Sequence, residues 1–169
     1  MTVIGVGLIG GSLALAAKRA KLVKQVVGYS KRRGDLYKAV ATGVLDRYCL
    51  NLSKAVQEAD LVVLATPVGV LESMARAISP HLKAGAIVTD VGSVKGLLVS
   101  KMEAWLPNGT FFVGGHPIAG SEKSGGLASL PTLFDRSVAI LTPTPHTDRK
   151  ALVKVAQLWK GMGTSVVEM

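Results

Sequence analysis

A glycine-rich segment near the start of the chain constrains the fold more than any other feature of the sequence. It reads Gly-Val-Gly-Leu-Ile-Gly at 5–10, between a β-branched run at 2–6 and an alanine- and leucine-rich stretch at 8–20. In such a turn the first glycine permits a tight bend, the second lets the backbone approach a pyrophosphate, and the third lets helix and strand pack closely. The positive end of the helix dipole then faces the phosphates. The expected cofactor contacts are Gly5, Gly7, Leu8, Ile9 and Gly10.

Strand-like and helix-like segments alternate along the rest of the chain. Hydrophobic residues make up 49% of the sequence and aromatic residues only 5%, so the core must be aliphatic, as in a parallel sheet buried on both faces. We expect further strands at 25–29, 48–50, 61–65, 86–91, 110–113, 137–141 and 165–167, and helices at 36–41, 52–59, 68–82, 94–106 and 148–162. The alternation predicts one α/β domain over residues 1–169, with a doubly wound, mainly parallel Rossmann-type sheet and helices on both faces.

The charge balance favours a small anionic partner. The chain carries 20 basic and 11 acidic residues, a formal net charge of +9. The basic residues are scattered and not interleaved with aromatic ones, which argues against nucleic acid as a partner. The apolar start at 3–17 is broken by glycines and is too short to span a bilayer, so we expect no membrane partner. Cys49 is the only cysteine, which excludes a disulfide within the chain and favours a cytoplasmic protein without a metal site.

The segment after the second expected strand bears on the identity of the cofactor. An acidic residue about 20 residues beyond the third glycine would bind the ribose hydroxyls of NAD and repel the 2′-phosphate of NADP. Ser30 stands at that position, and Lys31 and Arg32 follow it. A hydroxyl and two cations suit a 2′-phosphate, so these three residues predict NADP, with NAD the less favoured cofactor. A solvated surface turn and a ribose contact from Asp35, which is expected in the next helix, are the alternatives.

Two further loops follow expected strands and should lie at the same edge of the sheet. Thr66 and Pro67 come after the apolar run at 61–65, where they are expected to flank the cofactor. Thr66 could also cap the next helix. Ser93 comes after the strand at 86–91; it could cap the helix that follows, or hydrogen-bond a substrate hydroxyl or a catalytic group.

A glycine-flanked histidine is the strongest catalytic candidate. His116 lies in the segment 114–123, which we expect to be a loop after the strand at 110–113. The neighbouring glycines leave the imidazole accessible, and histidine titrates near neutral pH, which suits a general base. The other histidines lack such a setting, because His81 lies near an expected helix C-terminus and His146 lies in a proline-rich loop.

Taken together, these segments show that the chain resembles the prephenate/arogenate (cyclohexadienyl) dehydrogenase family. The matching segments, in the family's order, are GVGLIGGSLA at 5–14, GYSKR at 28–32, DLVVLATPV at 60–68, TDVGSVK at 89–95, GGHPIAGSEKSG at 114–125 and ILTPT at 140–144. They span essentially the whole chain. The fourth and fifth segments are specific to the family, whereas the glycine fingerprint is not.

The resemblance implies NADP-dependent oxidative decarboxylation of a cyclohexadienyl acid, prephenate or arogenate or both, in tyrosine biosynthesis. Hydride passes from the ring carbon that bears the hydroxyl to the nicotinamide, and carbon dioxide leaves as the ring becomes aromatic, with no metal required. The resemblance further implies that His116 polarises or deprotonates the hydroxyl and that Ser93 helps to orient it. The implied substrate contacts are Ser93, His116, Gly120, Ser121 and Glu122.

The resemblance also implies a region beyond this chain, because the family continues into a helical C-terminal domain that dimerises and supplies an arginine to a substrate carboxylate. We expect residues 1–169 to be the N-terminal domain of a longer enzyme that forms a homodimer only through that absent domain. Three alternatives are another β-hydroxyacid-type dehydrogenase or imine reductase, a non-catalytic NADP-sensing module, and a basic nucleic-acid binder. Turnover that depends on His116 would separate an enzyme from a sensor, and a salt-dependent affinity for DNA would mark the last.

Overall fold

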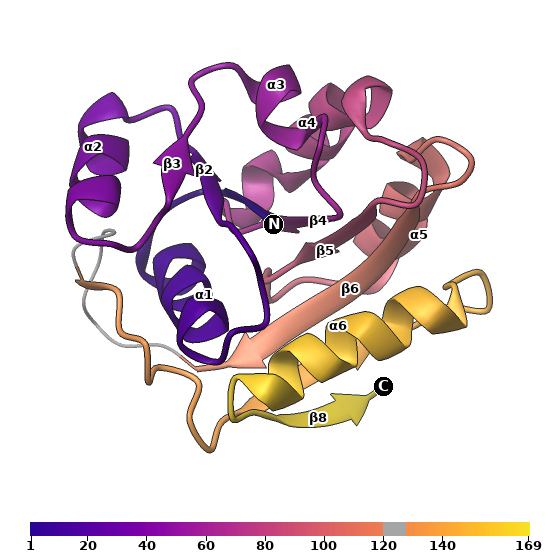
Figure 1. Ribbon diagram of the computed structural model, residues 1–169. Coiled ribbons are helices and arrows are strands. Elements are labelled where there is room, and N and C mark those ends of the chain that lie inside the picture. The colour runs from indigo at the N-terminus through magenta and orange to yellow at the C-terminus, as the bar shows by residue number, and fades with distance from the viewer. Residues whose placement is uncertain (120–127) are drawn as a thin grey trace.

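A single sheet runs through the centre of the molecule (Figure 1). The computed structural model describes residues 1–119 and 128–169, and within them eight strands form the sheet in the order β3-β2-β1-β4-β5-β6-β7-β8. The strands are β1 (Thr2–Ile4), β2 (Val27–Tyr29), β3 (Arg47–Tyr48), β4 (Leu61–Leu64), β5 (Ile87–Asp90), β6 (Phe111–Ile118), β7 (Val138–Thr142) and β8 (Ser165–Glu168). Neighbours are parallel except β6 and β7. The expected doubly wound, mainly parallel sheet is confirmed.

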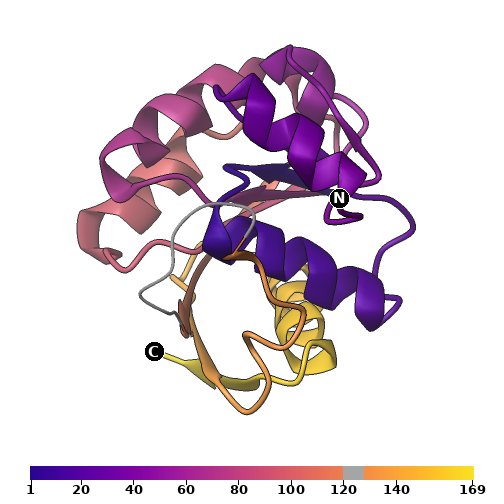
Figure 2. The ribbon, with the colours of Figure 1, turned by 90° about the vertical axis from the view of Figure 1, so that its left-hand side faces the viewer.

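Helices cover both faces of this sheet. They are α1 (Leu8–Arg19), α2 (Arg33–Ala41), α3 (Leu52–Val56), α4 (Val68–Ile78), the 3₁₀ turn η1 (Ser79–His81), α5 (Gly96–Trp105) and α6 (Arg149–Gly161). One buried cluster joins α1, α2 and α6 to one face, and a second joins α3, α4 and α5 to the other. Figure 2 shows α1 and α6 on one side of the sheet and α4 and α5 on the opposite side. No helix in the described parts of the chain has the length and apolar character that a membrane span needs.

The strand order reverses beside β1. β1 pairs with β2 on one side and with β4 on the other. The connection through α1 therefore leads from β1 to one side of the sheet, and the connection through α3 leads from β3 back to the other side of β1. In open α/β sheets the loops diverge at such a switch point, and a crevice opens outside the carboxyl ends of the strands. The carboxyl edge beside β1 is therefore the place where the fold favours a ligand.

Several elements have other bounds than the sequence predicts: α2 begins at Arg33 and not at 36, and α3 and α4 end at Val56 and Ile78 and not at 59 and 82. Two further differences affect the candidate site. β6 runs to Ile118 and does not end at residue 113, because its second half pairs antiparallel with β7, from Gly114 opposite Thr142 to Ile118 opposite Val138. α5 begins at Gly96, two residues later than expected, because residues 91–95 form a loop at the end of β5. The extension of β6 arises from pairing between distant segments, which local sequence patterns do not report. The loop before α5 is held by bonds from Gly92 and Lys95 to Asp90.

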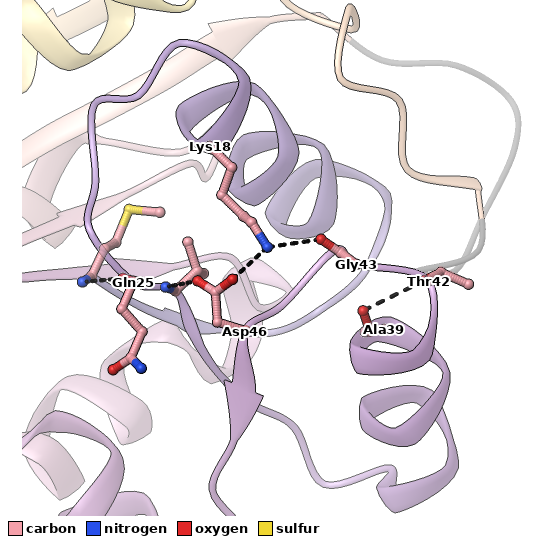
Figure 3. Close-up of polar contacts among 8 residues, drawn as sticks. Lys18, Gln25, Ala39, Thr42, Gly43 and Asp46 are labelled. Atoms are coloured by element: carbon pink, nitrogen blue, oxygen red, sulfur yellow. Dashed lines mark hydrogen bonds and ion pairs between the residues drawn. The ribbon is translucent and has the colours of Figure 1, made fainter.

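An ion pair at the opposite edge of the sheet joins three segments (Figure 3). The carboxylate of Asp46 accepts hydrogen bonds from Lys18 Nζ at 2.6 Å and from the backbone N–H of Val26 at 2.6 Å. The Lys18 ammonium also donates to the carbonyl of Gly43 at 2.9 Å. Partial burial acts to raise the pKa of Asp46, but the bonds from Lys18 and Val26 outweigh it, so the pKa lies below its ordinary value. Asp46 thus ties the end of α1 to β2 and to the turn after α2.

Replacing Asp46 with Asn tests this tie. We expect the free energy of unfolding at neutral pH to fall by about 1–2 kcal/mol, the range for hydrogen bonds to an ionised group near the surface. Because the folded-state pKa is depressed, the stabilisation is present above the ordinary carboxyl pKa and is lost as pH falls through the folded value. Urea unfolding of both proteins near pH 7 and near pH 3 should therefore show a difference that shrinks at low pH. An equal difference at both pH values would assign the loss to packing and not to charge.

Candidate functional site

The glycine-rich turn lies at the carboxyl edge and is held by close backbone contacts. Gly5 has a φ of +98°, a region that side chains disfavour, and a Cβ there would lie 2.5 Å from the carbonyl oxygen of Ala65. A Cβ on Gly10 would lie 2.1 Å from the carbonyl oxygen of Gly5. The backbone N–H of Gly5 donates to the carbonyl of Tyr29 at 2.9 Å. The turn is therefore packed against the ends of both strands that flank β1, and two of its glycines are required for that packing.

The start of α1, by contrast, is open. The first bond within the helix runs from the N–H of Gly11 to the carbonyl of Gly7 at 2.8 Å, so the N–H groups of Leu8, Ile9 and Gly10 have no partner inside the helix. Gly7 occupies the N-cap position without a side chain to cap it, and the first turn contains no acidic residue. A Cβ on Gly7 would meet no described atom within 4 Å. Free amides, a positive dipole and open space form a place where an anionic group fits.

The cations expected at the ribose lie at the end of β2 on the same edge. Lys31 and Arg32 are exposed, and within the described residues neither forms an ion pair. The hydroxyl oxygen of Ser30 accepts a hydrogen bond from the backbone N–H of Arg32 at 3.2 Å, which fixes the turn between β2 and α2. Asp35 lies within α2, where it was expected. The two charges are therefore available to an anion beside the glycine-rich turn.

The loop after β4 forms the wall against which Gly5 packs, but Thr66 does not cap α4. Pro67 occupies the N-cap position, and no side chain bonds to the helix start. The hydroxyl of Thr66 is buried and has no hydrogen-bond partner in the described parts of the chain. Capping is therefore the wrong explanation of Thr66. The expected contact between Thr66 and the cofactor stays a prediction, with which its unpaired hydroxyl is compatible.

Ser93 lies in the loop after β5 and does not cap α5 either. Lys95 holds the N-cap position of that helix, and Ser93 is exposed with no hydrogen bond to any residue that the structure describes. The capping alternative is therefore wrong for this residue as well. Its hydroxyl is free to meet a ligand at the carboxyl edge.

The same loop contains a buried ion pair to which the sequence patterns gave no role. Asp90, the last residue of β5, is completely buried, and its carboxylate lies 2.7 Å from Lys95 Nζ. The carboxylate also accepts from the backbone N–H of Gly92 at 3.0 Å and of Gly115 at 3.1 Å. Burial raises the pKa of Asp90, and the Lys95 ammonium and the two backbone donors oppose that rise. An acid at a strand end with a lysine five residues later is the only signal in the sequence that could have indicated this pair.

His116 lies within β6 and not in a loop after it, which corrects the expectation. It pairs with Ile140 of β7, and β6 leaves β5 after Val113, so His116 still stands beyond the carboxyl end of β5. Its Nδ1 is buried without a hydrogen-bond partner among the described residues, although the side chain as a whole is only partly buried. The ring therefore has one enclosed nitrogen and one nitrogen, Nε2, left for a ligand.

The face of the sheet that His116 occupies is apolar where no helix covers it. Side chains two apart on a strand share a face, and so do directly paired residues, which places Ile118 and Val138 beside His116. Their exposed fractions are 52% and 36%. Val167 of β8 pairs with Ile140 and is exposed at 44% on the same face. The imidazole thus borders an open apolar surface.

The expected substrate contacts Gly120, Ser121 and Glu122 lie outside the described residues. Beyond them the chain returns to the start of α1, where the N–H of Leu130 donates to Ser12 Oγ at 2.9 Å. A Cβ on Gly11 would lie 2.1 Å from Ser129 Oγ, so this glycine packs closely against a side chain of the returning segment. The sequence had indicated no role for Gly11 beyond the fingerprint.

A groove of about 610 Å³ lies at the opposite edge of the sheet. Its lining includes Gln25, Leu61 and Ile87, which stand at the amino ends of β2, β4 and β5. The candidate residues that the structure describes lie beyond the carboxyl ends of β1, β2, β4 and β5, so this groove is separate from them. Within the described residues no three His, Cys, Asp or Glu side chains gather closely enough to hold a metal ion.

Comparison with known proteins agrees with this geometry. Residues 13–168 match the family described as the prephenate dehydrogenase nucleotide-binding domain. The chain belongs to this family. It is 39% identical to a prephenate dehydrogenase of Bacillus subtilis, over 98% of this chain and 45% of that protein. The resemblance noted from the sequence is therefore confirmed.

Solved structures of the same family share the fold closely. The chain superposes on a prephenate dehydrogenase from Aquifex aeolicus, in complex with hydroxyphenyl propionate and NAD⁺, with a TM-score of 0.93 and 38% identity. It superposes on Synechocystis arogenate dehydrogenase with a TM-score of 0.91 and 32% identity. Each comparison covers 99% of this chain and 58% of the other. The chain thus spans about half the length of the relatives that it matches.

The packing of the glycine-rich turn predicts opposite outcomes for two similar substitutions. Gly10→Ala places a Cβ against the backbone of Gly5, which cannot move aside, and we expect the free energy of unfolding to fall by about 2 kcal/mol or more. Gly7→Ala places a Cβ in open space at a helix N-cap, and we expect a change within about 1 kcal/mol. Denaturant unfolding of the two variants measures the contrast. Equal losses would contradict the packing described for this turn.

Proposed function

We propose that this chain supplies the NADP site and the catalytic histidine for the oxidative decarboxylation of prephenate, arogenate or both. The observation that carries the proposal is the meeting of two features at one edge of the sheet. An open helix start suited to phosphates follows β1, and a partly enclosed histidine follows the β5 edge, in a chain that belongs to the prephenate dehydrogenase nucleotide-binding family. The named relatives include both prephenate and arogenate dehydrogenases.

The nucleotide is assigned to the glycine-rich turn and to the cations after β2. The amides of Leu8, Ile9 and Gly10 would hold the pyrophosphate, and Gly7 would let it approach. Lys31 and Arg32, exposed and without ion-pair partners in the described chain, would hold a 2′-phosphate, which is why we propose NADP. The Aquifex relative was solved with NAD⁺, so NAD is the competing outcome for this site. Thr66 and Pro67 would flank the nucleotide from the β4 loop.

The residues of this chain would act on the substrate's hydroxyl group. When bound, the oxidised nicotinamide accepts a hydride from the ring carbon that bears this hydroxyl. His116 Nε2 would take the hydroxyl proton as a general base, while Ser93, exposed and free of other bonds among the described residues, would orient the oxygen. The carbon–oxygen double bond forms as hydride leaves. The carbon–carboxylate bond then breaks, and its electron pair makes the ring aromatic and the oxygen a phenolate. This oxygen would take back the proton from His116 as carbon dioxide departs. Because the aromatic ring stabilises the product, the carboxylate needs no acid catalyst to leave.

The surroundings of His116 suit a cyclic substrate. The exposed Ile118 and Val138 on the same face would contact the ring of the substrate, and Gly120, Ser121 and Glu122 are proposed to contact its side chain. We further propose that the helical domain implied by the family resemblance covers this apolar face, excludes water and dimerises. The free thiol of Cys49 fits the reducing cytoplasm that we propose as the setting.

The cofactor assignment predicts a selective loss of affinity. We expect Lys31→Ala/Arg32→Ala to weaken NADP binding by at least about ten-fold, because each charge-assisted contact is worth about 1.5–3 kcal/mol. NAD affinity should change little, since NAD has no 2′-phosphate. Calorimetric titration with each nucleotide measures the two affinities. The control variant is Lys150→Ala/Lys154→Ala, which removes the same charge from the exposed side of α6, far from the site. Equal weakening of NADP and NAD would refute the 2′-phosphate contact.

The histidine assignment predicts a loss of turnover without a loss of folding. In the full-length protein we expect His116→Ala to lower kcat by about 10²–10⁴-fold, the usual contribution of general acid–base catalysis. Unfolding midpoint and nucleotide affinity should stay near wild type, because Nδ1 of His116 makes no hydrogen bond to the described residues. His146→Ala, at an exposed loop position, is the matched control and should change nothing. A His116→Ala variant with full turnover would remove the histidine from the mechanism.

A further inference from the structure

Asp90 is a completely buried acid at the carboxyl end of β5. Its Oδ2 accepts from Lys95 Nζ at 2.7 Å and from the N–H of Gly92 at 3.0 Å, and its Oδ1 accepts from the N–H of Gly115 at 3.1 Å. The Lys95 ammonium also donates to the carbonyl of Gly92 and is itself largely buried. Removing a carboxylate from water is costly unless every bond is made well. Because replacing a buried ion pair by apolar residues is often neutral or stabilising, this pair is better explained by what its bonds hold in place than by stability alone.

The donors to Asp90 come from the two segments that hold the proposed reacting groups. Gly92 is the residue before Ser93, and Gly115 is the residue before His116. Lys95 closes the same loop at the start of α5. One carboxylate therefore fixes the backbone on both sides of the site. No other described side chain bonds to both segments.

The bond to Gly115 lies where β6 loses its partner on that side. The last residue of β6 that pairs with β5 is Val113, and the residues after it pair only with β7 on the other side. The N–H of Gly115 would otherwise be a buried donor without an acceptor, and the Asp90 side chain takes the place of the missing strand. The His116 ring has no described hydrogen-bond partner on Nδ1, so its orientation depends on this backbone.

We propose that Asp90 is a positioning residue, which holds the backbone at Gly115 and Gly92 so that His116 and Ser93 meet the substrate's hydroxyl together. The proposal rests on the function proposed above. Asp90 does not touch the substrate, and it exchanges no proton with His116. The Lys95 ammonium neutralises the buried carboxylate of Asp90 through this ion pair. Loss of the carboxylate should disorder the two reacting groups relative to each other and leave the nucleotide site, on the far side of β4, unchanged.

Asp46 provides a matched control. Like Asp90, its carboxylate accepts from a lysine ammonium and from a backbone N–H, and the lysine also bonds a glycine carbonyl. Figure 3 shows this arrangement at the end of α1, beside Gly43 and Gln25. Asp46 differs in being partly exposed and in lying at the amino edge of the sheet. Substitution at either site should weaken folding, but only Asp90 touches the segments of His116 and Ser93.

The test compares Asp90→Asn with Asp46→Asn in the full-length protein. Asn keeps the size of Asp but presents an NH₂ group toward donors, so the bonds cannot all form. We expect kcat to fall about 10–100-fold for Asp90→Asn, the usual effect of losing a group that orients a reacting residue, with nucleotide Kd within about three-fold. Asp46→Asn should lower the unfolding midpoint and leave kcat near wild type. The assays are run at a temperature well below the unfolding midpoints of both variants. Equal kcat values for the two variants under that condition would overturn the proposal.

A second readout separates this proposal from the proposed function. In the isolated 169-residue chain, the imidazole resonances of His116 should shift or broaden in Asp90→Asn and stay unchanged in Asp46→Asn. If wild type turns over neither substrate, the proposed function fails, and the resonances still decide whether Asp90 positions His116. Unmoved His116 resonances in Asp90→Asn would overturn the positioning role. If Asp90→Asn does not fold, the double variant Asp90→Asn/Lys95→Met takes its place, because it leaves no unpaired buried charge. Its matched control is Asp46→Asn/Lys18→Met.

Discussion

The close approach of three backbone segments at the β1–α1 turn is the contact on which the carboxyl edge depends. Gly5 lies against the backbone after β4, Gly10 lies against Gly5, and Gly11 lies against Ser129. The contacts of Gly5 and Gly10 are with backbone atoms and are closer than a Cβ would permit, so the turn can be this compact only because these two positions are glycines. Because the turn is compact, the start of α1 lies at the carboxyl edge, where the loops after β1 and β4 diverge. The anion site is therefore a direct result of packing, and it would exist in this fold without any charged side chain.

The second determinant is that β6 changes partners along its length. Its first half continues the parallel sheet beside β5, and its second half is held by antiparallel pairing with β7. A strand that continues past its neighbour carries its side chains beyond the carboxyl edge, and this places His116 near the loop after β5. In a loop, the same histidine would be free to turn; in a paired strand its direction is fixed by the sheet. The antiparallel pair thus fixes the position of His116, as the proposed role of general base would require.

Much of this arrangement could be predicted from the sequence. What could not be predicted depends mainly on contacts between residues far apart in the chain. The glycine-rich turn, the apolar strands and the helices are local patterns, and the structure confirms the sheet that they predict. The Gly-Gly-His-Pro segment reads locally as a loop, because glycine and proline disfavour strands, yet pairing with 138–142 makes it strand. Thr66 and Ser93 each precede a helix but cap none, since Pro67 and Lys95 hold those positions. The role of Asp90 depends on bonds to Gly115, 25 residues away, which no local pattern reports.

The distribution of paired and unpaired cations separates the two ends of the candidate site. At the end of β2, Lys31 and Arg32 have no counter-ion among the described residues, so their charge would add to the dipole of α1 in attracting an anionic nucleotide. At the ends of β5 and β6, Lys95 is neutralised by Asp90, and the surroundings of His116 are apolar. The buried pair therefore holds the backbone while adding little net charge beside the proposed base, His116, and the unpaired positive charge lies where the phosphates would bind.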